Sequence, residues 1–198
     1  GMLQRVRVYR AHSLHALLSV LDDVSVRLAE AQRSAAPGAG PAGPPAASQI
    51  KPSLLILDSI SAVAGPVVGE RRHSQGQTLL MCTGRTLRQL ADTYSMAVVV
   101  TNHLVMDRTA ERLAQEQGAQ QQGPLQPMLP AMGEWWRGQV HMRLQLRMQP
   151  TGSLDAPRIA TLSLHPDKPA DGPIYYRIHP GGLFTEQQLP VAAGYSGY

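Results

Sequence analysis

The chain has 198 residues with a formal net charge of +4, which suits one domain with a sizeable core and is compatible with a nucleic-acid partner. Its single cysteine, Cys82, excludes an internal disulfide and favours a reducing compartment such as the nucleus or cytosol. No stretch approaches the roughly 18 consecutive apolar residues that cross a bilayer. Charged residues from Arg5 onward interrupt any signal-peptide pattern, so no membrane partner is expected.

The first fifty residues predict a strand, a helix and a loop. Valines alternate with arginines over residues 4–10, which predicts a short strand. Ser13 precedes apolar residues at helical spacing over residues 14–28, so it is expected to cap a helix there. Residues 34–48 consist mainly of Ala, Gly and Pro, a composition that predicts a flexible surface loop.

Two apolar runs end in polar side chains. Residues 54–57 and 96–100 are short and continuous, as expected of strands buried in a parallel sheet. The polar residues that follow the two runs are Asp58 and Ser59, and then Thr101, Asn102 and His103. Ligands of open α/β sheets bind at the carboxyl ends of the strands. The two runs therefore point to a nucleoside-triphosphate fold.

A helix is predicted between these runs, over residues 77–94. Its apolar residues form one stripe, whereas Arg85, Arg88 and Asp92 are expected to face water. Residues 104–133 are rich in Gln, Gly and Pro and predict a long loop, which in a compact domain is often functional. Strands are predicted over residues 141–148, 158–164 and 174–178. This order predicts an α/β fold, a parallel sheet extended by a β meander.

Each candidate site residue has two interpretations. Asp58 is either a Walker B aspartate, which holds magnesium through water, or a cap at a strand end. Asn102 and His103 either donate hydrogen bonds to a γ-phosphate or form a satisfied polar pair. Four loop arginines either face DNA phosphates or are solvated charges, namely Arg71, Arg72, Arg108 and Arg112. For Trp135 and Trp136, packing is favoured over stacking on a base.

Residues 53–69, 74–103 and 132–146 resemble the RecA/RadA class of recombinases. They are most similar to the eukaryotic paralogues of the strand-exchange recombinase, above all the D-type paralogue in its plant or algal form. The resemblance implies a RecA-like P-loop NTPase core with a mostly parallel sheet, flanking helices and a C-terminal β meander. It also implies ATP and magnesium as cofactors, and a nuclear role in homologous-recombination repair. The partners it implies are other recombinase paralogues and single-stranded DNA.

The resemblance also assigns roles to particular residues. Asp58 matches Walker B, with Ser59 beside it, and His103 matches the nucleotide sensor that follows Asn102. Residues 65–77 and 104–133 match the first and second DNA-facing loops. Residues 165–169 match a cap that reaches over a neighbouring subunit's nucleotide.

The sequence departs from the family's pattern, most of all at the phosphate-binding half of the nucleotide site. It contains no G-x-x-x-x-G-K-[ST] phosphate loop, and in the family's fold the strand leading to that loop lies beside the strand over residues 96–101. We therefore expect a partial RecA-like domain over residues 1–189, a disordered tail over 190–198, weak ATP binding and no hydrolysis by this chain alone. The alternatives are an ATPase completed by a partner chain and a structural adaptor unrelated to DNA.

Overall fold

The computed structural model describes residues 5–34, 53–68, 73–107, 128–148, 156–169 and 172–185. These residues fall into two compact units, which divide between Gln139 and Val140. Unit 1 holds the described residues up to 139, and unit 2 holds those from 140 onward. Residues 35–48 of the predicted loop and the predicted tail lie outside the described residues. A single domain over residues 1–189 stays a prediction.

Unit 1 opens with the predicted helix, α1 (Leu14–Ser34). Ser13 caps it, because the Ser13 Oγ accepts a hydrogen bond of 3.2 Å from the Ala16 backbone N–H. The strand predicted over residues 4–10 is wrong. Residues 6–10 form neither helix nor strand and are exposed, and no described strand pairs with them to give the alternation a buried face.

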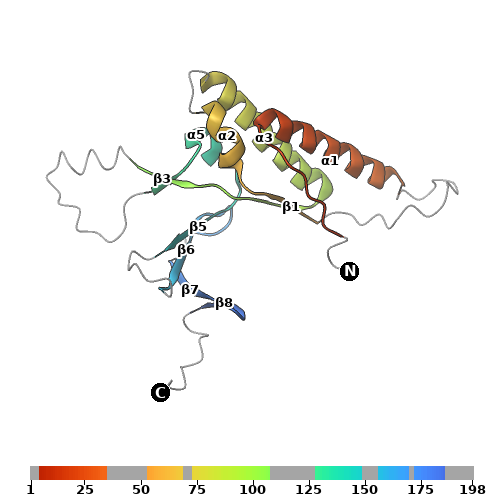
Figure 1. Cartoon of the computed structure of the whole chain (residues 1–198). Coiled ribbons are helices and arrows are strands. Elements are labelled where there is room, and N and C mark those ends of the chain that lie inside the picture. The colour runs from red at the N-terminus through yellow and green to blue at the C-terminus, as the bar shows by residue number, and fades with distance from the viewer. Residues whose placement is uncertain are drawn as a thin grey trace, which may run out of the picture. The chain divides into compact units, whose positions relative to one another are not determined.

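The two diagnostic strands are parallel neighbours, as predicted. β1 (Leu54–Leu57) pairs with β2 (Ala97–Val100) in a register that places Leu57 opposite Val100. The helices α1, α2 (Ile60–Val68) and α3 (His73–Tyr94) lie on the same side of these strands (Figure 1). The connection between the two strands thus contains the helices α2 and α3, as is usual for parallel pairs.

Only one face of the β1–β2 pair is covered within the described residues. Four side chains pack against the helical core, namely Leu55, Leu57, Val98 and Val100. The predicted burial of these strands is therefore confirmed on that face only, because the opposite face is exposed among the described residues: Leu54, Ile56 and Val99 are 47–62% accessible to solvent. Among the described residues no strand pairs with the second edge of β2.

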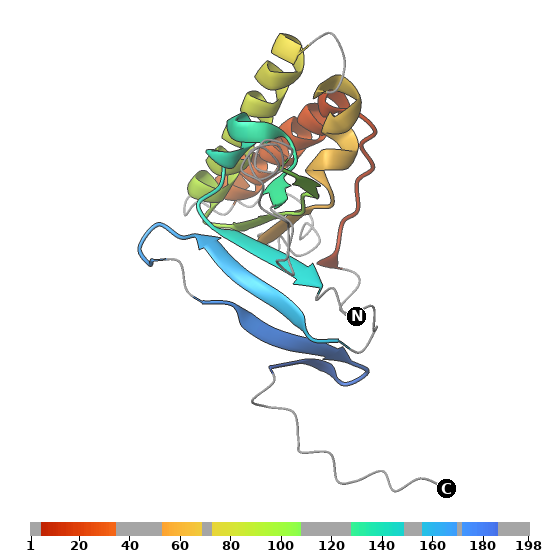
Figure 2. The same ribbon diagram turned by 90° about the vertical axis from the view of Figure 1, so that its left-hand side faces the viewer.

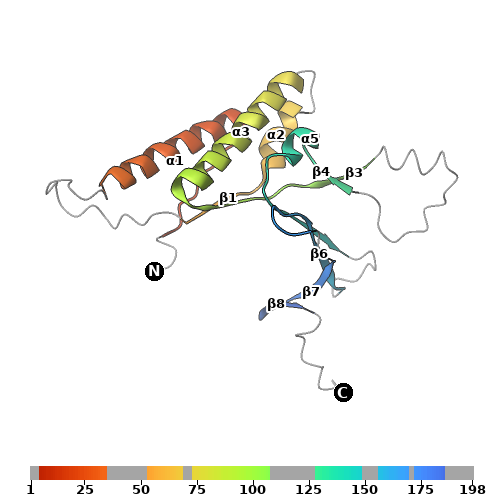
Figure 3. The ribbon, with the colours of Figure 1, turned by 180° about the vertical axis from the view of Figure 1, so that it is seen from behind.

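Leucines from α1 and α3 form most of the core of unit 1, and these two helices lie side by side (Figure 3). The predicted stripe of α3 is confirmed, since Leu80, Leu87, Leu90 and Tyr94 are all buried. α3 begins before the predicted start at residue 77, so the segment 65–77 expected to be a DNA-facing loop overlaps α2 and α3.

The predicted loop over residues 104–133 is wrong at both of its ends. β3 (Leu104–Met106) and β4 (Met128–Pro130) pair antiparallel, and α5 (Gly133–Arg137) follows directly. Hydrogen bonding between segments distant in sequence stabilises the hairpin, which a local Gln, Gly and Pro content does not reveal. The residues between β3 and β4 beyond Asp107 lie outside the described part of the chain.

Unit 2 is the predicted β meander. β5 (Arg143–Met148), β6 (Arg158–Leu164), β7 (Ile174–His179) and β8 (Gly182–Thr185) are antiparallel neighbours in that order (Figure 2). The fourth strand is not in the prediction. A two-residue turn joins it to β7. Gly182, the first residue of β8, has a φ of 132°, a backbone conformation that favours glycine.

Candidate functional site

At the carboxyl ends of β1 and β2, the side chain of Asp58 lies beside the hydroxyl of Thr101. The ladder continues past both strands, because the Thr101 N–H donates to the Leu57 carbonyl (3.0 Å) and the Ile60 N–H donates to the Thr101 carbonyl (3.1 Å). The Thr101 Oγ1 donates a hydrogen bond of 2.6 Å to Oδ1 of Asp58. Both side chains are exposed, so this charge-assisted hydrogen bond orients an accessible carboxylate.

Ser59 is the N-cap of α2. Its Oγ accepts a hydrogen bond of 3.3 Å from the Ala62 N–H and lies 3.1 Å from the Ser61 Oγ. The peptide bond between Asp58 and Ser59 is cis. The amino terminus of α2 thus lies directly beside the carboxylate, and two serine hydroxyls join Thr101 at this edge.

The side chain of Asn102 is directed toward the segment that follows β4. Its Nδ2 donates to the Ala131 carbonyl (2.9 Å), and the Ala131 N–H donates to the His103 carbonyl (2.8 Å). The Asn102 Oδ1 is buried without a hydrogen-bond partner in the described structure, whereas the His103 side chain is exposed. The hydrogen bond from Nδ2 therefore fits the interpretation of Asn102 as a structural polar residue, whereas its buried Oδ1 acceptor is not satisfied by any described residue.

These residues fit a magnesium nucleotide only in part. Magnesium favours oxygen ligands and keeps several waters, so the exposed Asp58 carboxylate suits a contact through water. Within the described ranges no group of three His, Cys, Asp or Glu side chains could hold a metal ion. Other ligands would come from water and from nucleotide phosphates. The hydroxyls of Ser59 and Thr101 offer further oxygen atoms at the same edge.

The four predicted DNA-binding arginines lie outside the described residues. The two tryptophans of α5 differ sharply in exposure. Trp136 is 5% accessible and belongs to the core of unit 1, which confirms packing for this residue, whereas Trp135 is 53% accessible.

Sequence reasoning missed the hydrogen bonds of two side chains in unit 1, Thr101 and Arg88. The parallel register places residue 101 opposite residue 58, so the hydrogen bond of Thr101 follows once the register is known. Arg88 was expected to face water. Instead its Nε donates to the Gln139 carbonyl (2.9 Å), and its Nη2 donates to the Gly138 carbonyl. No local signal identifies this pair, because about fifty residues separate donor and acceptors.

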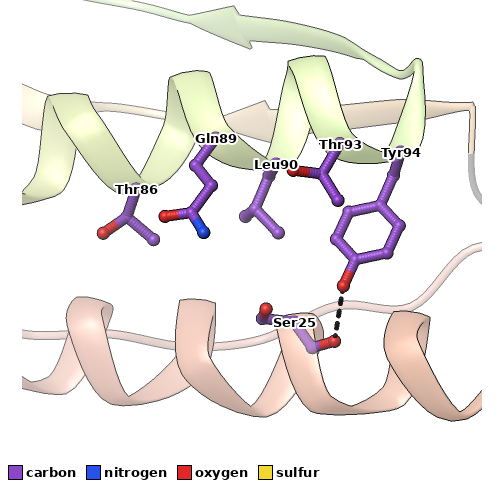
Figure 4. Close-up of a pocket in the computed structure, with 6 residues that line it drawn as sticks. All are labelled: Ser25, Thr86, Gln89, Leu90, Thr93 and Tyr94. Carbon is purple, nitrogen blue, oxygen red and sulfur yellow. Dashed lines mark hydrogen bonds between the residues drawn. The ribbon is translucent and has the colours of Figure 1, made fainter.

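A shallow groove between α1 and α3 lies outside this edge. Ser25 lines it from α1, and five residues line it from α3, namely Thr86, Gln89, Leu90, Thr93 and Tyr94 (Figure 4). The Tyr94 hydroxyl donates to the Ser25 carbonyl (3.2 Å) and closes one end of the groove. Tyr94 precedes the amino end of β2, whereas Asp58 and Thr101 follow the carboxyl ends. The groove is therefore separate from the candidate nucleotide edge.

Among the helices that the structure describes, none combines the length and the apolar character needed to cross a membrane.

Comparison with known proteins relates the chain to recombinases. A model of the Rad51 family matches residues 44–175. The chain is 31% identical over 170 residues to the DNA repair protein RAD51 homolog 4 of Bos taurus, an alignment that covers 85% of this chain and 43% of that protein. It is 29% identical over 194 residues to the Mus musculus protein of the same name, covering 97% of this chain and 50% of that protein. The chain spans about half the length of these relatives.

Proposed function

Because the chain belongs to the Rad51 family, we propose that it is a recombinase paralogue of homologous-recombination DNA repair. It assembles with other recombinase paralogues and assists the recombinase on single-stranded DNA. Two relatives whose names describe DNA repair proteins support this function. This activity takes place in the nucleus. The single cysteine, Cys82, is exposed and free, which is compatible with the reducing conditions of that compartment.

The observation that carries the proposal is the paired edge of β1 and β2. Four polar side chains lie at the carboxyl ends of these parallel strands. They are the oriented and exposed carboxylate of Asp58, the hydroxyls of Ser59 and Thr101, and the exposed side chain of His103. This edge is where α/β proteins bind nucleotides. Asp58 would hold magnesium through water, and Asn102 and His103 would donate hydrogen bonds to a terminal phosphate.

The edge of β1 and β2 provides only part of a nucleotide-binding site, because the phosphate-loop groups that bind the phosphates are missing from the sequence. A phosphate loop cradles phosphates with successive backbone N–H groups and a lysine, and this sequence has no such motif. We therefore propose that this chain by itself binds magnesium and ATP weakly and does not hydrolyse ATP. Its role in repair then rests on assembly and DNA contacts.

A second candidate function is an ATPase whose site is completed by a phosphate loop on another polypeptide. The observation that favours it is the second edge of β2, which no described strand pairs, beside the exposed face that carries Ile56 and Val99. Unpaired edges and open apolar faces of a parallel sheet are normally covered. Co-expression with candidate paralogues, followed by measurement of ATP turnover, separates the two functions: turnover only in a complex, lost in Asp58→Ala, supports this one.

DNA binding is tested by the fluorescence anisotropy of a labelled oligo-dT at several salt concentrations. We expect binding that weakens with salt, because phosphate contacts release counterions. Alanine at Arg71, Arg72, Arg108 and Arg112 together reduces the slope of log K against log salt by about 2.8, at about 0.7 per contact. A charge-matched control removes four exposed arginines elsewhere, namely Arg7, Arg27, Arg33 and Arg85.

The outcomes of this test are distinct. If both quadruple variants lose the same slope, binding is non-specific attraction and the four loop arginines are not the DNA contacts. If the wild-type chain does not bind oligo-dT at low salt, the proposed contact with single-stranded DNA is wrong.

Nucleotide binding is tested with a fluorescent ATP analogue in the presence and absence of magnesium. The expected result is weak binding that requires magnesium and is lost in Asp58→Ala but not in Asp92→Ala, an exposed carboxylate of α3. ATP turnover by the wild-type chain alone, lost in Asp58→Ala, would contradict the proposed absence of hydrolysis.

A further inference from the structure

One face of the meander in unit 2 is apolar and exposed. Residues that pair directly across neighbouring strands lie on the same face of a sheet, and the register joins Leu146 to Ala160 and then to Ile174. By the same register one face of the sheet carries large apolar side chains from three strands. They are Leu144, Leu146 and Met148 of β5, Ile174 and Ile178 of β7, and Leu183 of β8. We call these six side chains the meander face.

The exposure of the meander face is unusual for an antiparallel sheet. Such sheets normally direct their apolar side chains into a core and their polar side chains to water. Here the six side chains are each 54–69% accessible. The opposite face carries polar and basic residues, including Gln145, Arg147 and Thr161, around the buried Ile159. The alternation is clear, but the apolar side of the sheet is the side left open.

The size of the meander face is sufficient for an interface. A Leu, Ile or Met side chain exposes roughly 60–100 Å² of apolar surface when half or more accessible, so the six side chains expose roughly 400–600 Å². This is at the upper end of the patches found on monomers. Two such faces packed together would bury about 800–1,200 Å², close to the lower limit of specific interfaces.

The charges of unit 2 are arranged so that two copies can meet on this face. Arg147 and Arg177 lie on the opposite face, with Ile159, Tyr175 and Phe184. On the same side of the sheet as the meander face lies one basic residue of the described strands, Arg158, which pairs with Met148 and Tyr176 at one end of β6. A two-fold axis through the centre of the face would place both Arg158 side chains at the rim, where water solvates them.

We propose that the meander face is a self-association surface, on which a second copy of this chain packs its own meander face. The product is a sheet-on-sheet sandwich, with the two sheets about 10 Å apart and their strands crossing at about 30°. Because the buried area is small, the dimer is weak and half-dissociates at roughly 1–100 µM. The proposal does not depend on nucleotide or DNA binding.

The test is sedimentation velocity of the full chain from about 1 to 200 µM, with a reducing agent because Cys82 is exposed. The wild-type chain is expected to double in mass over this range. Leu146→Glu and Ile178→Glu each place a charge on the meander face, and each should raise the dissociation constant at least tenfold. Leu146→Thr keeps a strand-forming residue and should weaken the dimer less, which guards against a variant that fails to fold.

Two matched variants complete the test. Ser163→Glu adds the same charge to an exposed position on the opposite side of β6, and Ile56→Glu adds it to the exposed face of β1 in unit 1. Both should leave the dissociation constant unchanged, and far-UV circular dichroism should match the wild-type spectrum for every variant.

Three outcomes would overturn the proposal. The first is a wild-type chain that stays monomeric to 200 µM, which would leave the meander face to a different polypeptide. The second is a dimer abolished by Ile56→Glu and unaffected by Leu146→Glu, which would place the contact on unit 1. The third is a dimer that all four charge variants leave intact.

Discussion

Arg88 of α3 should stabilise the end of α5 from a distance of about fifty residues along the chain. Its guanidinium donates to the carbonyls of Gly138 and Gln139, directly after α5. Helix ends leave carbonyl groups without intrahelical partners, and a basic side chain is a favourable donor to them. Arg88→Met keeps most of the aliphatic stem and removes both hydrogen bonds.

The expected magnitude follows from the surroundings of these groups. A hydrogen bond that involves a charged group contributes about 1.5–3 kcal/mol, and leaving a buried acceptor unsatisfied costs about 1–3 kcal/mol. Arg88 is half-buried and the Gly138 residue is exposed, so water replaces part of what the substitution removes. We therefore expect Arg88→Met to lower the free energy of unfolding by about 1–2 kcal/mol.

Urea unfolding measures this effect, with tryptophan fluorescence as the readout because both tryptophans lie on α5. Arg85→Met is the control, since Arg85 is exposed on the same helix and should change the free energy by less than about 0.5 kcal/mol. If the two variants unfold at the same urea concentration with the same slope, the hydrogen bonds of Arg88 do not stabilise α5 and the reasoning is refuted.

Three further pairs of substitutions test other contacts, each by urea unfolding followed by circular dichroism. Trp136→Ala should cost about 3–5 kcal/mol because it opens a cavity in the core, whereas Trp135→Ala should cost less than about 1 kcal/mol; equal costs would contradict the assigned burial. Ser13→Ala should cost about 1 kcal/mol through loss of the α1 cap, and Ser13→Asp should restore it. Thr101→Val should cost at most about 1 kcal/mol, because its hydrogen bond to Asp58 is exposed, and Thr101→Ser should behave as wild type.

Sequence patterns predicted the elements whose cause is local. The spacing of leucines in α1 and α3 places one stripe per helix in the core, and Ser13 caps α1 as expected. The apolar runs at β1 and β2 and the punctuated strands of the meander also form as predicted. Where the pattern failed, the cause was a missing or distant partner. The alternation over residues 4–10 has no strand to pair with among the described residues, and the hairpin of β3 and β4 joins residues too far apart for a local pattern to reveal.

For the candidate site too, the sequence predicted the residues at the strand ends but not the contacts between them. The sequence identified Asp58 as an aspartate at a strand end, and the position of Asn102 and His103 after the neighbouring strand. It did not reveal that Thr101 orients Asp58, or that the Asn102 amide binds the Ala131 carbonyl. Nucleotide and DNA roles of these residues stay predictions, as do those of the four loop arginines.

The sequence alone determined the family, the helices, the parallel strand pair and the absence of a phosphate-loop motif, because each follows from residue types within one short segment. Only the tertiary structure decided which groups meet across the chain and which apolar faces stay open. Arg88 reaches α5 through the packing of two helices, and the meander face is exposed because no described element covers it. Apolar periodicity shows that a strand has a face to bury, whereas burial itself depends on a second layer that lies elsewhere in the chain or in another molecule.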